Sequence, residues 1–88
     1  MNTELKDTVA LMNSADYKDR FNAEFEQLQI RINKLSVMLH RWSIGDLNFT
    51  PICPRYLLEK QLQLMVEYRN ILVARAYIEK ISLDLNDK

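Results

Sequence analysis

Large apolar residues follow one another at alternating steps of four and three through the first half of the chain. They are Phe21, Phe25, Leu28, Ile32, Leu35, Leu39 and Trp42. This spacing places all of them on one face of an α-helix. Ser14, ahead of Asp16 and Asp19, supplies an N-cap oxygen, and the two aspartates suit the positive end of the helix dipole. The pattern predicts a long helix over residues 15–42.

The only glycine and both prolines lie together just after this helix. Gly45 can adopt the left-handed conformation that ends a helix, whereas Pro51 and Pro54 cannot continue one. Pro54 suits the first turn of a following helix. We therefore expect a reversal over residues 44–53 and a second helix over residues 54–81, so that the two helices form an antiparallel αα-hairpin.

The second predicted helix has a wider apolar surface than the first. One row of residues at seven-residue spacing contains Leu58, Met65 and Leu72. A neighbouring row with the same spacing contains Leu57, Leu64, Ile71 and Ile78. Because a single partner helix covers only one narrow seam, we expect a further element to cover the second row.

The segment 1–13 carries Leu5, Val9 and Met12 at helical spacing and predicts a short amphipathic helix capped by Thr3. A helix this short is stable only when it docks on another surface. This segment, another copy of the chain, or both would cover the second row. The predicted fold is all-α: a long antiparallel αα-hairpin with a short N-terminal helix. It forms a single domain over all 88 residues and assembles into an oligomeric helical bundle.

Charge and composition argue against several classes of function. Twelve Lys and Arg residues balance twelve Asp and Glu residues, whereas a generic DNA- or RNA-binding protein needs an excess of cations to displace counterions from phosphates. No apolar run approaches the roughly 18 residues that a membrane span needs. The single cysteine, Cys53, cannot form an internal disulfide. We expect a soluble cytosolic protein that binds neither nucleic acid nor membranes.

Motifs of catalysis and metal binding are not evident. His40 and Cys53 have no second histidine or cysteine at ligand spacing, and nothing places the two together beside an oxyanion loop. The sequence contains no glycine-rich phosphate loop and no paired-carboxylate motif. We therefore expect no catalytic activity, no metal and no cofactor.

Polar residues at seven-residue spacing flank the apolar seam on both helices. The second helix carries Gln61, Tyr68 and Arg75, and the first carries Glu24 and Arg31. In an antiparallel hairpin that reverses near the middle of the chain, facing residues have numbers that add to about 97. Glu24 then lies near Arg75, and Arg31 near Tyr68. These residues form either a structural network that fixes the register or a polar ligand pocket in the wall of the bundle.

Cations and aromatic residues also gather at the start of the first helix. They are Tyr17, Lys18, Arg20 and Phe21. Because the numbers of facing residues add to about 97, Tyr77 and Lys80 are expected at the same end of the hairpin. Helix N-terminal N–H groups, cations and aromatic faces together suit a phosphate with a base stacked nearby. The alternative is a solvated first turn. Arg55 and Tyr56 form a similar pair at the start of the second helix.

Two segments carry a resemblance to a known family, "DYKDRFNAEFEQLQIRINKLSVML" and "PRYLLEKQLQLMVEYRNILVARAYIE". The chain resembles a family of small tailed-phage helical-hairpin proteins found in crAss-like phages and relatives of T-even phages. The likeness covers residues 16 to 80. In the first segment it rests on Tyr17, Arg20, Glu24, Leu28, Arg31 and Leu35. In the second it rests on Leu57, Leu58, Gln61, Met65, Tyr68, Leu72 and Arg75.

In size and form the chain is also similar to the phage anti-CBASS and anti-Thoeris sponges, oligomers that sequester a nucleotide second messenger without cleaving it. The Gly-Tyr-Arg motif of the best-known sponge family is absent. The resemblance implies a counter-defence protein that binds a cyclic oligonucleotide or a cyclic ADP-ribose type of messenger in the host cytoplasm. The alternatives are a protein-binding inhibitor or adaptor that docks its apolar helix face on a host protein, and a structural accessory protein of the virion.

The ligand-binding residues expected from these observations come from both groups of polar and aromatic side chains. They are Tyr17, Lys18, Arg20, Phe21, Arg31, Tyr68, Arg75 and Tyr77.

Overall fold

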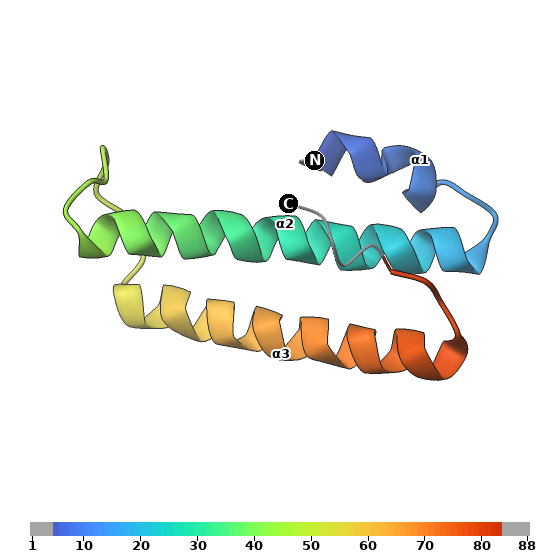
Figure 1. Ribbon diagram of the computed structural model, residues 1–88. Helices are drawn as coiled ribbons and strands as arrows, with labels where there is room; N and C mark the ends of the chain where they lie inside the picture. The colour runs from blue at the N-terminus through green and yellow to red at the C-terminus, as the bar shows by residue number, and fades with distance from the viewer. Residues whose placement is uncertain (1–4, 84–88) are drawn as a thin grey trace.

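The computed structural model describes residues 5–83, and these are all helix, turn or connecting chain. In chain order they form a 3-10 helix η1 (Leu5–Thr8) and the α-helices α1 (Val9–Met12), α2 (Tyr17–Ser43) and α3 (Arg55–Glu79). Helices α2 and α3 lie side by side in opposite directions, and α1 lies against the other side of α2 (Figure 1). The predicted all-α hairpin is confirmed.

Helix α2 begins two residues later than predicted, and its N-cap is Asp16 and not Ser14. The Asp16 side chain accepts a hydrogen bond from the Lys18 N–H at 2.9 Å, which satisfies one of the free donors of the first turn. Ser14 supports this turn from outside the helix: its hydroxyl donates to Asp19 at 2.8 Å and accepts from the Asp16 N–H at 3.0 Å. Asp16 is the more favourable N-cap because its carboxylate, unlike the hydroxyl of Ser14, also carries a negative charge that complements the helix dipole.

The end of α2 has the geometry that the glycine predicted. Gly45 has φ of 74°, its N–H donates to the Trp42 carbonyl at 3.2 Å, and the Asp46 N–H donates to the Arg41 carbonyl at 2.8 Å. These two bonds form a Schellman motif, which satisfies the last carbonyls of the helix and turns the chain. The reversal before α3 therefore starts at a residue without a side chain.

Helix α3 ends in a similar turn, but with a lysine in the left-handed position. Lys80 has φ of 59°, and the Ile81 N–H donates to the Ala76 carbonyl at 2.8 Å. The turn sends the chain back over the hairpin, where Ile81 is buried in the core and Leu83 packs against it. Burial of Ile81 offsets the strain of the left-handed lysine.

The core lies along the seam between α2 and α3. Its buried members are Phe21, Phe25, Leu28, Ile32, Leu72, Ala76 and Ile81. The predicted stripe on α2 is confirmed, because its residues are buried except for Leu35 and Trp42, which are half-buried. On α3 the row of Leu72 faces the seam, with Met65 and Leu62 packed against the core.

The register of the hairpin agrees with the prediction that facing residue numbers add to about 97. Arg75 lies over the ring of Phe21, Arg69 donates to Gln29 at 3.4 Å, and Arg55 lies over the ring of Trp42. These contacts come from the two ends and the middle of the hairpin. The turn therefore sets the register, and the register is kept along the whole length of both helices.

The N-terminal segment docks on α2 and does not touch α3 within the described residues. Among the side chains described there, Thr8 is buried and Leu5 is half-buried, whereas Val9 and Met12 are about half exposed, so Val9 and Met12 do not form the buried apolar face that was predicted. The Thr8 hydroxyl donates to the Leu5 carbonyl at 2.7 Å and accepts from Gln27 Nε2 at 2.9 Å. Gln27 Nε2 donates to both Thr8 and Met12, so polar contacts help to hold this short segment on α2. The predicted cap, Thr3, lies outside the described residues.

The second apolar row of α3 stays uncovered. Its members are exposed: Leu57, Leu64, Ile71 and Ile78. The sequence left open whether the N-terminal segment, another copy of the chain, or both cover this row. The described part of the N-terminal segment packs on α2 and therefore does not cover it. No described helix is both long and apolar enough to cross a bilayer.

Candidate functional site at the open end of the hairpin

Three polar side chains from both helices meet at the end of the hairpin away from the turn. Arg75 Nη2 donates to the Tyr17 hydroxyl oxygen at 2.8 Å, and the Tyr17 hydroxyl donates to Glu79 Oε1 at 2.8 Å. Arg75 Nε also donates to Glu79 Oε2 at 3.2 Å. The three side chains form a closed ring of hydrogen bonds that links the first turn of α2 to the last turn of α3.

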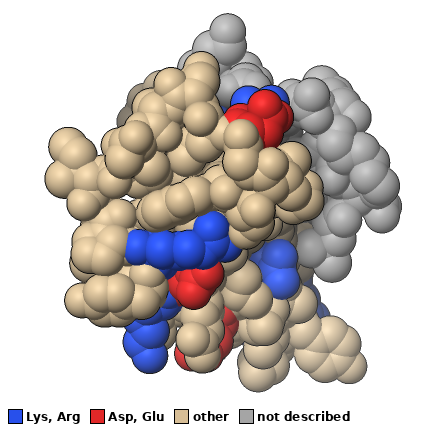
Figure 2. Space-filling model, turned by 90° about the vertical axis from the view of Figure 1, so that its left-hand side faces the viewer, with Lys and Arg blue, Asp and Glu red and all other residues tan. Residues whose placement is uncertain are grey.

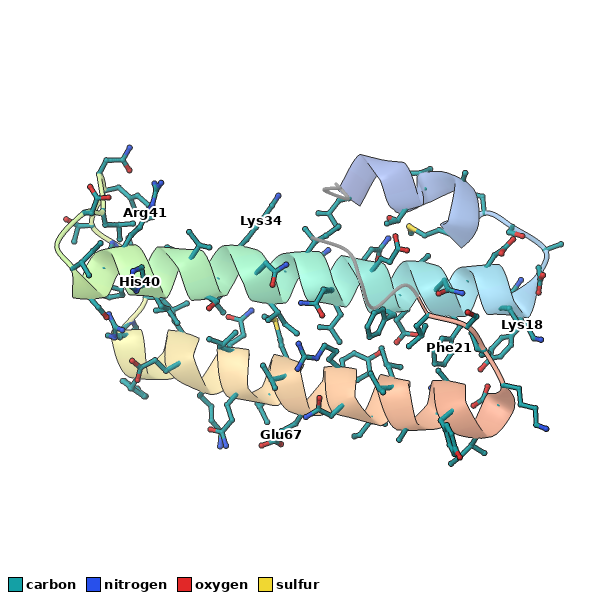
Figure 3. The ribbon with its side chains drawn as sticks, viewed as in Figure 1. Lys18, Phe21, Lys34, His40, Arg41 and Glu67 are labelled. Carbon is teal, nitrogen blue, oxygen red and sulfur yellow. The ribbon has the colours of Figure 1, made fainter. Side chains whose placement is uncertain are left out.

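Aromatic faces hold this ring in place. The guanidinium carbon of Arg75 lies 5.0 Å from the centroid of the Phe21 ring, and the Tyr17 and Phe21 rings meet edge to face at 6.1 Å. Phe21 points into the seam between the helices, and Lys18 extends from the same end of α2 (Figure 3). A guanidinium over an aromatic face is fixed in orientation while its edge stays accessible. The Arg75 side chain is 45% exposed.

The hydrogen bonds change the protonation equilibria of the ring. Donation to Glu79 raises the pKa of Tyr17 above its ordinary value of 10.0; partial burial adds to this, and the charge of Arg75 opposes it. The same bond from Tyr17 is the main cause that lowers the pKa of Glu79 below its ordinary value of 4.5, and Arg75 contributes further. The hydrogen bond to Glu79 raises the pKa of Arg75. At neutral pH the ring therefore holds one cation, one anion and a neutral phenol.

Arg75 keeps donor capacity beyond this ring. Its Nε and Nη2 atoms are occupied, and within residues 5–83 no hydrogen bond from Nη1 is found. A guanidinium offers five N–H groups in a planar fork. The accessible edge of Arg75 can therefore donate to an additional oxygen ligand.

The other residues expected at this end occupy different positions. Lys18 and Arg20 are exposed on the first turn of α2, and Arg20 Nη1 donates to the Ser14 carbonyl at 2.9 Å. Tyr77 is 87% exposed. Residues two apart on a helix point roughly 200° away from each other, so Tyr77 lies on the side of α3 opposite to Arg75 and does not join the cluster.

The predicted pairing of Glu24 with Arg75 is wrong. Arg75 bonds Glu79 and Tyr17, and Glu24 is exposed. Glu79 lies one turn further along the same helix, and such i,i+4 pairs form without any constraint from the partner helix. Tyr17 stands one heptad before Glu24 and presents a hydroxyl at the same edge of the seam. Arg75 therefore contacts the neighbouring polar position and not the predicted one.

The second predicted pair, Arg31 and Tyr68, is likewise not joined by a hydrogen bond. Both residues are exposed, and both lie away from the Arg75 cluster near the middle of their helices. Tyr68 lines an open groove of about 540 Å³ on the surface of α3. The groove is lined by Cys53, Leu57, Lys60, Gln61, Leu64, Met65 and Tyr68.

The turn end of the hairpin carries a similar arrangement of arginine, aromatic ring and glutamate. Arg55 lies 5.3 Å from the Trp42 ring centroid, donates to Glu59 at 2.7 Å and donates to Ser43 at 2.7 Å. Viewed from this end, positive and negative side chains lie interspersed on a mostly uncharged surface (Figure 2). No large patch of one sign is visible on this face, so it does not have the surface of a phosphate-backbone binder.

Metal chemistry has no visible basis in the part of the chain that the structure describes. No group of three or more histidine, cysteine, aspartate and glutamate side chains there is placed to hold a metal ion. His40 is exposed at the end of α2, and Cys53 is a half-buried free thiol in the turn before α3.

A family model matches residues 15–78. The chain belongs to the Sequestin family. The Sequestin match spans both helices and the intervening turn, and it includes Tyr17, Phe21 and Arg75. The name Sequestin indicates sequestration of another molecule. No match was found among curated proteins or among solved structures.

Glu79, just beyond the residues of the Sequestin match, belongs to the hydrogen-bonded ring but was not among the residues expected from the sequence. It accepts hydrogen bonds from both Tyr17 and Arg75. Its position four residues after Arg75 was a usable signal, since acidic and basic residues at this spacing pair on a helix surface.

Proposed function

We propose that this Sequestin-family chain is a phage counter-defence protein that binds a nucleotide immune messenger and holds it without cleaving it. The messenger is of the cyclic oligonucleotide or cyclic ADP-ribose type, and the site of action is the host cytoplasm. The observation that carries this proposal is the guanidinium of Arg75, fixed over Phe21 with an accessible edge. The family match supports a sequestering role, and the resemblance to phage sponges supports the ligand class.

The charges around Arg75 define how a phosphate would bind. Glu79 neutralises part of the charge of Arg75, so one guanidinium alone attracts a phosphate weakly. Lys18 and Arg20 are exposed on the adjacent first turn of α2 and add two cations. Charge-assisted bonds to phosphate contribute about 1.5–3 kcal/mol each. In this proposal the phosphate lies between Arg75 and the first turn of α2.

The aromatic residues define where a base would lie. Tyr17 is 46% exposed and sits beside the guanidinium of Arg75. Base stacking on an aromatic ring contributes about 1–3 kcal/mol and tolerates different bases. Tyr17 is therefore the proposed stacking surface. Arg31, Tyr68 and Tyr77, also expected to bind ligand, lie elsewhere and are not part of this subsite.

Calorimetric titration with cyclic dinucleotides, cyclic trinucleotides and cyclic ADP-ribose isomers tests the proposal. We expect one of these ligands to bind and its affinity to fall at least tenfold in Arg75→Leu, the loss of one charge-assisted bond. Arg41→Leu is the matched control, because Arg41 is an exposed arginine at the opposite end of α2. Failure of every ligand to bind, or equal affinities of the two variants, would contradict the proposal.

The exposed apolar row of α3 favours a second function, that of an adaptor or inhibitor docked on a host protein. Leu64 and Ile71 are 51% and 58% exposed, and apolar residues at such spacing are typical of a helix that enters a partner's groove. Affinity purification from infected cells would then recover one host protein in stoichiometric amount. Leu64→Glu would abolish this recovery and leave nucleotide binding unchanged.

A further inference from the structure

Glu79 keeps free acceptor positions after it has bonded Tyr17 and Arg75. Its Oε1 accepts from the Tyr17 hydroxyl at 2.8 Å, and its Oε2 accepts from Arg75 Nε at 3.2 Å. A carboxylate has about four lone-pair sites on its two oxygens. Within residues 5–83 no further hydrogen bond to either oxygen is found, and the Glu79 side chain is 34% exposed. Each oxygen can therefore accept another hydrogen bond from a partner outside the chain.

The same two bonds fix the charge and the orientation of this carboxylate. The hydrogen bond from Tyr17 is the main cause that lowers the pKa of Glu79 below its ordinary value of 4.5, and Arg75 contributes further. Glu79 is therefore an anion at neutral pH, and a carboxylate anion accepts hydrogen bonds but donates none. Because two neighbours already hold the side chain, little conformational entropy is lost when it receives a further donor.

Stability alone gives little reason for a carboxylate at this position. Glu79 is the last residue of α3, where the helix dipole disfavours a negative charge. Its ion pair with Arg75 is largely exposed and has the less favourable order, with the cation before the anion along the helix. The carboxylate also weakens the attraction of Arg75 for a phosphate. These costs are offset if Glu79 itself contacts the ligand.

We propose that Glu79 accepts a hydrogen bond from a ribose hydroxyl of the ligand and thereby selects a ribonucleotide over its deoxy analogue. This role rests on the proposed function. Carboxylates accept hydrogen bonds from ribose hydroxyls in dinucleotide-binding folds. The order of the groups also agrees. A ribose joins the base to the phosphate, and Glu79 bonds both Tyr17, the proposed stacking surface, and Arg75, the proposed phosphate contact.

The opposite role would be that of a competitor, which occupies Arg75 until the phosphate displaces it. The geometry of the guanidinium disfavours this role. Glu79 bonds the Nε atom of Arg75, whereas the free Nη1 atom lies at the other end of the planar fork. A phosphate at Nη1 leaves the carboxylate in place, with its remaining acceptors available to the ribose.

Calorimetric titration of the wild type and Glu79→Gln tests this role. The probe is the tightest-binding member of the panel of cyclic dinucleotides, cyclic trinucleotides and cyclic ADP-ribose isomers. It is compared with deoxy analogues that lack the free hydroxyls of one ribose at a time. We expect the wild type to bind the parent at least about tenfold more tightly than one of these analogues, the effect of one charge-assisted hydrogen bond. Glu79→Gln, with an uncharged acceptor, should prefer the parent by less than about threefold.

Glu59→Gln is the matched control, because Glu59 bonds Arg55 in the same i,i+4 arrangement at the turn end of the hairpin. This variant should keep the full preference for the parent. An equal preference in the wild type and Glu79→Gln, or tighter binding of both ligands to Glu79→Gln, would overturn the role of Glu79 and leave the proposed function standing. Failure of every member of the panel to bind would overturn the proposed function, and the role of Glu79 with it.

Discussion

The guanidinium of Arg75 lies over the face of Phe21, 5.0 Å from the ring centroid. This contact joins the last turn of α3 to the first turn of α2, and Tyr17 and Glu79 complete it with hydrogen bonds. The cluster therefore serves two purposes in our account. It closes the open end of the hairpin, and in the proposed function it also presents the edge of a guanidinium to the ligand.

The stability that this cluster contributes should depend on pH at both ends of the scale. The pKa of Glu79 is lowered on folding, so its contribution is complete above about 4.5 and is lost as the pH falls through its folded value. The pKa of Tyr17 is raised, so its contribution is complete below about 10 and is lost as the pH rises through its folded value.

Thermal melts of the wild type and Tyr17→Phe from pH 3 to pH 11 measure this effect. We expect the difference between the two melting temperatures to be constant between about pH 5.5 and 9 and to narrow beyond both limits. Tyr56→Phe is the control, because Tyr56 is 73% exposed and should show no such difference. A difference that stays constant to pH 3 would mean that Glu79 does not bond Tyr17 in solution.

Leu72 should be the most sensitive core position of α3. It is fully buried against the stripe of α2, and Leu72→Ala removes its contacts and leaves a cavity. We expect a loss of about 2–5 kcal/mol in the free energy of unfolding, measured by urea denaturation. Val37→Ala on the exposed side of α2 should change it by less than about 0.5 kcal/mol.

The two left-handed residues at the helix ends should respond in opposite directions. At Gly45 an added Cβ meets no atom within 4 Å, so Gly45→Ala costs only the backbone strain of a left-handed residue, about 1–2 kcal/mol. Lys80→Gly relieves the same strain at the end of α3, which we expect to stabilise the protein by about 0.4–1 kcal/mol. Denaturant midpoints measure both. A change in the free energy of unfolding with the same sign in both variants would be inconsistent with the helix-end geometry.

The docking of the N-terminal segment should depend on the hydroxyl of Thr8. Thr8→Val keeps the size of the side chain but removes one of the two acceptors of Gln27 Nε2, the other being Met12 Sδ, and a lost hydrogen bond costs about 0.5–1.5 kcal/mol. A segment of two short turns has little other energy to hold it. Hydrogen exchange should therefore become faster over residues 5–12 and stay unchanged in α2 and α3. Thr8→Ser, which retains the hydroxyl, should exchange more slowly than Thr8→Val.

The long-range pattern of the sequence determined the hairpin and its register. The apolar stripe from Phe21 to Trp42 predicts one long helix with one buried face. Gly45 and the two prolines predict a single reversal of the chain after it. The packing along the seam fixes the register together with the connection between Ser43 and Arg55, because a shift would move the apolar residues of α2 away from their partners. The observed pairs, Arg55 with Trp42 and Arg75 with Phe21, agree with the expected sum of about 97, although neither pair was itself predicted.

The tertiary structure alone decided which polar groups meet and which faces stay open. Arg75 had Glu24, Tyr17 and Glu79 within reach of its long side chain, and spacing along the sequence does not rank partners that differ by one helical turn. The N-terminal segment had two apolar surfaces available, and it packs on α2, where Thr8 accepts a hydrogen bond from Gln27. Such choices depend on the direction and distance of individual donors and acceptors, which periodicity does not encode. As a result the described residues leave the second apolar row of α3 exposed: Leu57, Leu64, Ile71 and Ile78.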